Sequence, residues 1–167
     1  MEETKDLWLF QCYTGLSYID MASLTPEDYK KADNGMYYIK KKRQKTGVEF
    51  TTILLKDATF IALKYKFNLP VKSNQRLNSY LKELADLCGI EKTLHTHMAR
   101  HTAAMYFFNY RPQIPTETIK KIFGWSDDRQ VKIYAKILDT TVFEDVAKME
   151  TEDEKFAREM NEIMLLD

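Results

Sequence analysis

The stretch from Gly35 to Leu55, "GMYYIKKKRQKTGVEFTTILL", differs in character from the rest of the chain. It is rich in Tyr, Ile, Val, Thr and Phe, which strands favour, and "KTG" interrupts it in the manner of a turn. The stretch therefore predicts one β-hairpin with a basic tip. Because the flanking segments carry apolar residues at helical spacing instead, the hairpin restricts the chain to a mostly helical α+β fold with one small antiparallel sheet.

Helices are expected on both sides of the hairpin. "DLWLFQCYTG" predicts a helix from about Asp6 to Gly15, "LSYIDMASL" predicts a short second helix, and "TPEDY" begins with a capping Thr25. "DATFIALKYKF", "SNQRLNSYLKELADLCG", "TETIKKIFG" and "DDRQVKIYAKIL" predict further helices after it. In the second of these, Ser73 is the expected cap. Its expected apolar stripe consists of Leu77, Tyr80, Leu81, Leu84 and Leu87.

The length and composition indicate a single domain, residues 1–167, with 44% hydrophobic and 30% charged residues. The formal net charge is zero, so only local clusters of charge can indicate a nucleic-acid partner. "MEETKD" lacks the apolar segment of a signal peptide, and no run reaches the roughly 18 apolar residues of a membrane span. We therefore expect a cytoplasmic protein without membrane association, with Cys12 and Cys88 as buried free thiols.

All three histidines of the chain fall in "LHTHMARHTAAMYFF", residues 94–108, whose apolar residues predict a half-buried helix. His97 and Arg100 are three positions apart, so they share a helix face and can converge on one target. A guanidinium can bind two oxygens at once, and an imidazole exchanges a proton near neutral pH, so the pair suits a phosphodiester. A core histidine beside a surface arginine is the plainer interpretation.

A zinc site is a second interpretation of the same segment. His97 and His101 are four positions apart, the spacing of a helical zinc pair, and His95 lies nearby. However, the segment lacks the Glu of H-E-x-x-H, and Arg100 would place a fixed positive charge beside the cation. We therefore expect no metal site.

The hairpin tip is a local cluster of positive charge, which attracts phosphate despite the zero net charge. Its members are Lys40, Lys41, Lys42, Arg43 and Lys45. A solvated surface is the ordinary interpretation of such a run. Taken alone, Tyr134 in "KIYAKI" and Trp125 in "FGWSDD" are typical of core residues.

Together, four segments resemble in order the motifs of the tyrosine recombinase catalytic domain, that is, the phage integrase family. "YTGLSYIDMASL" is similar to "TGLRxxEL", and "QKTGVEF" is similar to the turn that carries the catalytic lysine. "HMARHTAA" is similar to "HxLRHTfA", and "FGWSDDRQVKIYAKI" is similar to "LGHxxxxxTxxYxxx". The variant "TGLSYxD" further resembles integrases of Bacteroidetes-type conjugative transposons.

The resemblance implies a DNA strand transferase that works through a 3′-phosphotyrosyl intermediate without metal, ATP or another cofactor. Tyr134 would be the nucleophile, Arg100 would stabilise charge on the phosphate, and His97 would act in proton transfer. Lys45 would protonate the leaving 5′-oxygen. Trp125 would give an indole N–H to the phosphate, at a position that is His in most members.

One position departs from the family pattern. The first arginine of the family is Ser17 here, while Asp20 matches the acidic residue that braces the site. A serine cannot supply the charge of a guanidinium. Arg43 lies two residues before Lys45, and the period of a strand would place both on one side, so we take Arg43 as the candidate replacement. The expected DNA contacts are Lys41, Lys42 and Arg43.

The resemblance also implies the catalytic part of a longer integrase, without its core-binding domain. The parent would act as a homotetramer on double-stranded DNA, with the isolated domain monomeric. Residues 142–167 predict an amphipathic tail helix that docks on a neighbouring protomer, and capping its own domain is the alternative. Three other interpretations concern the whole chain: a catalytically decayed DNA-binding regulatory module, an interaction domain unrelated to nucleic acid, and a type IB topoisomerase.

Overall fold

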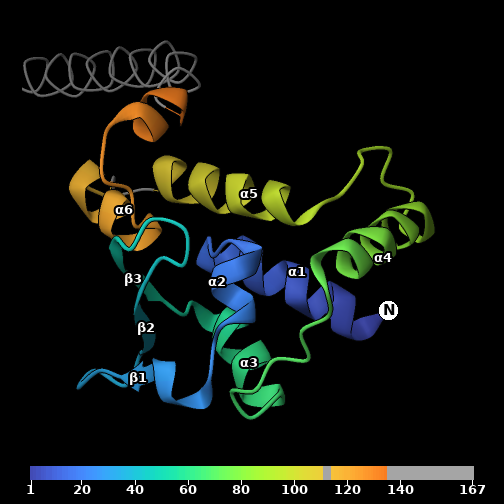
Figure 1. Cartoon of the computed structure of the whole chain (residues 1–167), viewed down its shortest axis with the longest axis horizontal. Helices are drawn as coiled ribbons and strands as arrows, with labels where there is room; N and C mark the ends of the chain where they lie inside the picture. The colour runs from blue at the N-terminus through green and yellow to red at the C-terminus, as the bar shows by residue number, and fades with distance from the viewer. Residues whose placement is uncertain (111–113, 135–167) are drawn as a thin grey trace, which may run out of the picture. The chain divides into compact units, whose positions relative to one another are not determined.

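The computed structural model describes residues 1–110 and 114–134. The chain divides into two units, Met1–Asp128 and Arg129–Asp167. The helices of the first unit are α1 (Glu2–Thr14), α2 (Tyr18–Ala22), α3 (Lys56–Lys64), α4 (Asn74–Leu87), α5 (Thr96–Asn109) and α6 (Thr116–Phe123). Its strands are β1 (Tyr29–Lys31), β2 (Tyr37–Lys42) and β3 (Glu49–Ile53), preceded by the 3-10 turn η1 (Pro26–Asp28) (Figure 1). The predicted mostly helical fold with a small antiparallel sheet is confirmed.

The sheet has the order β1-β2-β3, and both strand pairs are antiparallel. The predicted hairpin corresponds to β2 and β3, whereas β1 was not expected. Ile39 pairs with Tyr29 on one side and Thr52 on the other, and all three are buried. Because side chains alternate along a strand, this row faces the core together with Phe50.

The tip between β2 and β3 is a closed turn. The Arg43 N–H donates to the Val48 carbonyl at 2.8 Å, and the Gly47 N–H donates to the Arg43 carbonyl at 2.9 Å. Gly47 has φ 69°, a left-handed conformation that a glycine adopts without steric cost. These two hydrogen bonds fix the backbone of Arg43 relative to both strands.

Helix α1 lies in the centre of the first unit and contacts α3, α4 and α5. Its buried residues therefore surround the helix rather than forming one stripe. It begins at Glu2, earlier than the predicted Asp6. Acidic residues favour a helix N-terminus, and Lys64 pairs with Glu2 at 2.5 Å and with Asp6 at 2.6 Å, which together hold this first turn on α3.

The hydrophobic core joins α1, α3 and α4 to the inner face of the sheet. Its fully buried members include Leu7, Phe10, Met21, Ile39, Leu77 and Leu81. The predicted stripe of α4 was wrong at its end, because Leu87 is 76% exposed. The prediction that Cys88 is buried was wrong, because the last turn of α4 extends beyond the core and leaves Cys88 exposed. Cys12 is buried as expected, and burial raises the pKa of its thiol to about 12.

The remaining expectations concern the ends of the chain. "TPEDY" forms the short 3-10 turn η1, with a capping box between Thr25 and Asp28. In the second unit, residues 129–134 are helical, as expected. The proposed tail helix, residues 142–167, lies outside the described residues. Within residues 1–110 and 114–134, no helix is long and apolar enough to cross a membrane.

Replacing Thr52 by Val should destabilise the fold. The Thr52 hydroxyl donates to the Thr14 carbonyl at 2.8 Å and is fully buried, so Val keeps the shape but leaves a buried acceptor unpaired. We expect a loss of about 1–3 kcal/mol in the free energy of unfolding, measured by urea titration. Thr51→Val, on the opposite face of the same strand, is the control and should change it by less than about 0.5 kcal/mol. Equal losses would contradict the role of this hydrogen bond.

Candidate active site

A pocket of about 320 Å³ opens between the hairpin tip and the N-terminal ends of α4 and α5. Its lining residues are Ser17, Tyr18, Ile19, Arg43, Lys45, Asn74, Thr96, His97 and Arg100. Among these described residues the charges are basic, and none is a carboxylate. The two helix N-termini add partial positive charge at the same place. The pocket therefore suits an anion.

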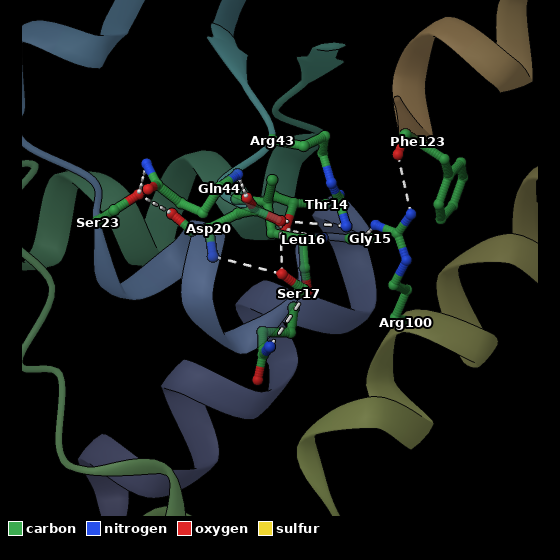
Figure 2. Close-up of polar contacts among 11 residues, drawn as sticks. Thr14, Gly15, Leu16, Ser17, Asp20, Ser23, Arg43, Gln44, Arg100 and Phe123 are labelled. Carbon is green, nitrogen blue, oxygen red and sulfur yellow. Dashed lines mark hydrogen bonds and ion pairs between the residues drawn. The ribbon is translucent and has the colours of Figure 1, made fainter. Parts of the chain in front are cut away.

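Arg100 is the most deeply placed charge in this pocket, with only 9% of its surface exposed. Its Nη1 donates to the Gly15 carbonyl after α1, and its Nη2 donates to the Phe123 carbonyl at the end of α6 at 2.9 Å (Figure 2). The rings of Phe123 and Trp125 lie 5.0 and 5.9 Å from the guanidinium carbon. Arg100 thus connects two helix ends as well as lining the pocket.

Ser17 and Asp20 occupy the start of α2. The Ser17 hydroxyl caps the helix by accepting from the Asp20 N–H and also donates to the Asp20 carboxylate. Asp20 is 2% exposed and accepts from the Gln44 N–H at 2.8 Å. Its Oδ2 lies 3.1 Å from Nη2 of Arg43 (Figure 2). Asp20 therefore holds the hairpin tip against α2 while lying behind the lining residues.

The two terminal nitrogens of the Arg43 guanidinium differ in their surroundings within the part of the chain that the structure describes. Its side chain is 12% exposed, and Nη1 is buried with no hydrogen-bond partner among the described residues. Burial lowers the pKa of Arg43, an effect that the nearby charge of Asp20 opposes, yet a guanidinium stays protonated at neutral pH. The ion pair with Asp20 therefore engages Nη2, while the residue as a whole lines the pocket.

Arg43 and Lys45 both line the pocket, but for a different reason than the sequence indicated. Strand β2 ends at Lys42, so the period of a strand does not apply to them, and the closed turn places both side chains instead. Lys45 is exposed on this turn. The sequence argument about strand geometry was therefore wrong, although both residues reach the same pocket.

The basic tip is partly neutralised by the fold itself. Lys41 donates to the Asp28 carboxylate at 2.7 Å and to the Ser23 carbonyl at 2.6 Å, and Lys40 lies 3.3 Å from Glu49. The sequence pattern gave no sign of these partners because Asp28 and Ser23 lie on other elements. Lys42 is exposed, so among the three predicted DNA contacts it has the most accessible side chain.

His97 lies at the N-terminus of α5, with its ring 4.5 Å from that of His101. Partial desolvation lowers the pKa of His97, and the neighbouring His101, His95 and Arg100 lower it further. His95 has a separate function, because its Nδ1 accepts from the Met98 N–H at 3.1 Å and caps α5. His97 is therefore biased toward the neutral imidazole, which can accept a proton.

Trp125 and Tyr134 do not belong to the lining of the pocket that the structure describes. Trp125 is half-buried, and its ring stacks on that of Phe123 with the ring centres 4.7 Å apart. The guanidinium carbon of Arg100 lies 5.9 Å from the Trp125 ring centre. Tyr134 is buried and belongs to the second unit, within the helical residues 129–134. The pocket thus brings together Arg43, Lys45, His97 and Arg100.

Sequence reasoning missed Asn74 and Thr96, the first residues of α4 and α5. The Thr96 hydroxyl donates to Asn74 Oδ1 at 3.1 Å, which joins the two helix ends at the pocket. Asn74 follows the Ser73 cap, so the predicted start of α4 could have identified Asn74 as the first residue of that helix. Its proximity to α5 depends on packing that a local pattern does not reveal.

Arg100→Lys should lower stability as well as any activity. Arg100 reaches the two carbonyls with two separate nitrogens of a planar guanidinium, whereas a lysine carries all its donors on one nitrogen and cannot reproduce that geometry. We expect a loss of about 2–4 kcal/mol in the free energy of unfolding, measured by urea titration. The control Arg76→Lys, at an exposed position, should stay within about 0.5 kcal/mol of wild type. An unchanged stability for Arg100→Lys would exclude its bridging role.

His97 should titrate below its ordinary pKa of 6.5, which NMR of its ring proton can measure. His101→Gln removes one nearby positive charge and should raise the His97 pKa toward that value. Because the folded-state pKa is depressed, the unfolded chain binds the proton more readily, so stability is full above about 6.5 and falls as the pH drops through it. A His97 pKa that His101→Gln leaves unchanged would contradict this account.

Comparison with known proteins places these motifs in a family. The model described as "Phage integrase family" matches residues 2–141, whereas no curated protein matches. The XerH site-specific recombinase, in a post-cleavage complex with a palindromic difH substrate, has a TM-score of 0.67 and 16% identity, covering 88% of this chain and 46% of that one. The XerA recombinase has a TM-score of 0.63 and 19% identity, with coverage of 89% and 63%. This chain therefore spans about half to two thirds of those proteins, and it belongs to the phage integrase family.

Proposed function

We propose that this chain is the catalytic domain of a tyrosine-type site-specific recombinase, which cleaves and rejoins DNA strands. The observation that carries the proposal is the convergence of Arg43, Lys45, His97 and Arg100 on one pocket without an acidic lining residue. A phosphodiester is an anion with two non-bridging oxygens, and guanidinium groups bind such oxygens well. Family membership supports DNA as the source of that phosphate.

The family resemblance implies the role of each group in this chemistry. Tyr134, supplied by the family motif, attacks the scissile phosphorus, forms a 3′-phosphotyrosyl bond and releases the 5′-oxygen. Lys45 gives that oxygen a proton, and His97 takes the phenolic proton from Tyr134. The bond energy is retained in the phosphotyrosyl ester, so attack by a 5′-hydroxyl reverses the step and reseals the strand without ATP.

Arg43 supplies the charge that the family places at the position of Ser17. Both residues line the same pocket, so a guanidinium from either position enters the same space. The place of Arg43 in the pocket lining supports the proposal, because its guanidinium carries the charge that Ser17 lacks. Arg100 contributes the second guanidinium and binds the other oxygen. The two arginines then stabilise the charge that develops on the phosphate.

The parent protein and its partners follow as further proposals. The chain spans 46% of XerH, in keeping with a longer integrase of which this is the catalytic part. We place that parent in a mobile element of the Bacteroidetes conjugative-transposon type, acting as a homotetramer on double-stranded DNA. Residues 142–167 would dock on a neighbouring protomer. Lys42 is the preferred contact to the DNA backbone, since the ammonium group of Lys41 already has partners within the protein.

A covalent-trapping experiment tests the proposal. The chain is mixed with a random-sequence pool of nicked duplexes, in which cleavage frees a short fragment and prevents resealing, and adducts are separated on a denaturing gel. We expect an adduct that Tyr134→Phe abolishes and EDTA leaves unchanged. Arg43→Ala should reduce the yield by about 10²–10³-fold, and the control Arg76→Ala should not. Sequencing the trapped DNA then gives the preferred site.

Three results would change the assignment. An adduct that persists in Tyr134→Phe would exclude this nucleophile, and sensitivity to EDTA would indicate metal-dependent chemistry. DNA binding without any adduct would favour the alternative function, a regulatory module whose chemistry has decayed. Ser17 is the observation that favours that alternative, since the family arginine is absent there.

A further inference from the structure

Gly124 ends α6 in a left-handed conformation with φ 58°. A Cβ built on this residue would lie 2.9 Å from both Cγ and Cδ of Arg43 and 3.1 Å from Cβ of Phe50. Non-bonded carbon atoms in proteins do not lie so close together, so a Cβ here would force its neighbours to move. The two Arg43 atoms lie in the middle of its side chain, where such a movement is costly. The stem of Arg43 therefore occupies the space that a side chain at position 124 would need.

The position of Arg43 is restricted at three points. Its backbone is fixed by the closed turn at Val48 and Gly47, and its guanidinium carbon lies 5.8 Å from the Phe50 ring centre. At the far end, Nη2 pairs with Asp20 at 3.1 Å. Between the backbone and the guanidinium, the stem lies against Gly124, so this path requires the absence of a side chain there.

We propose that Gly124 is a positioning residue for Arg43: the missing side chain leaves the room through which Arg43 reaches the phosphate pocket. The inference rests on the proposed function for its catalytic meaning. Because the clash falls on Cγ and Cδ, moving them also moves the guanidinium that follows. Gly124 thereby couples the end of α6, next to Trp125, to the hairpin tip.

The left-handed backbone alone does not account for this arrangement. Gly89, at the end of α4, has a similar φ of 65°, yet a Cβ there meets nothing within 4 Å. An alanine at either position carries the same backbone strain. Gly89→Ala is therefore the matched control, and any additional effect of Gly124→Ala reports on the contact with Arg43 and Phe50.

The packing is tested by a thermal double-mutant cycle. Gly124→Ala should melt about 5 °C below Gly89→Ala, because overpacking adds to the common strain. Combining it with Arg43→Ala removes the clashing stem, so the double variant should recover part of this difference. If Gly124→Ala fails to fold, folding of the double variant supports the proposal and its failure overturns it. Equal melting of the two glycine variants also overturns it.

Positioning is tested by phosphate binding, a measurement that stability alone does not change. Inorganic phosphate is titrated into the folded chain while NMR follows the Arg43 Nε–H signal. We expect a shift in wild type and in Gly89→Ala, and a dissociation constant raised by about tenfold or more in Gly124→Ala, as for one lost charge-assisted hydrogen bond. In the background of Arg43→Ala, where another pocket signal is followed, Gly124→Ala should have no further effect on binding.

The two proposals fail in different ways. If wild type forms no DNA adduct but binds phosphate with the expected dependence on Gly124, the proposed function fails and the positioning role stands. If adducts form and depend on Arg43, while Gly124→Ala binds phosphate and forms adducts like Gly89→Ala, the positioning role fails and the proposed function stands.

Discussion

The pocket depends first on how the buried Arg100 is held. Its guanidinium donates to the Gly15 and Phe123 carbonyls, at the ends of α1 and α6, where helix dipoles present partial negative charge. These carbonyls satisfy donors without carrying a full charge, so they position the cation and do not cancel it. The same contacts join two elements distant in sequence. One side chain therefore both lines the pocket and connects two elements.

Arg43 solves the same problem in a different way. It is paired with a carboxylate, Asp20, whose charge is also shared by the Ser17 hydroxyl and the Gln44 N–H. Sharing weakens the hold of Asp20 on any one donor, and of the two terminal nitrogens of Arg43 only Nη2 has a polar partner among the described residues. The pocket thus contains one guanidinium held by backbone carbonyls and another held by a hydrogen-bonded carboxylate. Both arrangements fix direction before an anion arrives, which lowers the reorganisation that binding requires.

Sequence patterns predicted what depends on local order. The hairpin, the ends of α1 and α4 at Gly15 and Ser73, and the shared face of His97 and Arg100 all follow from spacing within one segment. The partners of Lys41 and the wall formed by Asn74 required packing between elements, which no single segment encodes. The strand argument for Arg43 failed because β2 ends at Lys42, before both Arg43 and Lys45. The family motifs predicted some of these long-range relations, since they indicate which distant segments contribute to one site.

The proposed replacement of the family arginine at position 17 by Arg43 is consistent with this architecture. The pocket is assembled from ends of helices and a turn, so several backbone positions surround one small volume. A long guanidinium side chain can enter that volume from any of them, whereas a second arginine at position 17 would compete with Arg43 for Asp20 and repel it. Ser17 relieves that repulsion and instead gives Asp20 a hydroxyl donor. Under the proposed function the site must preserve the charge at the phosphate, and the element that supplies this charge can differ.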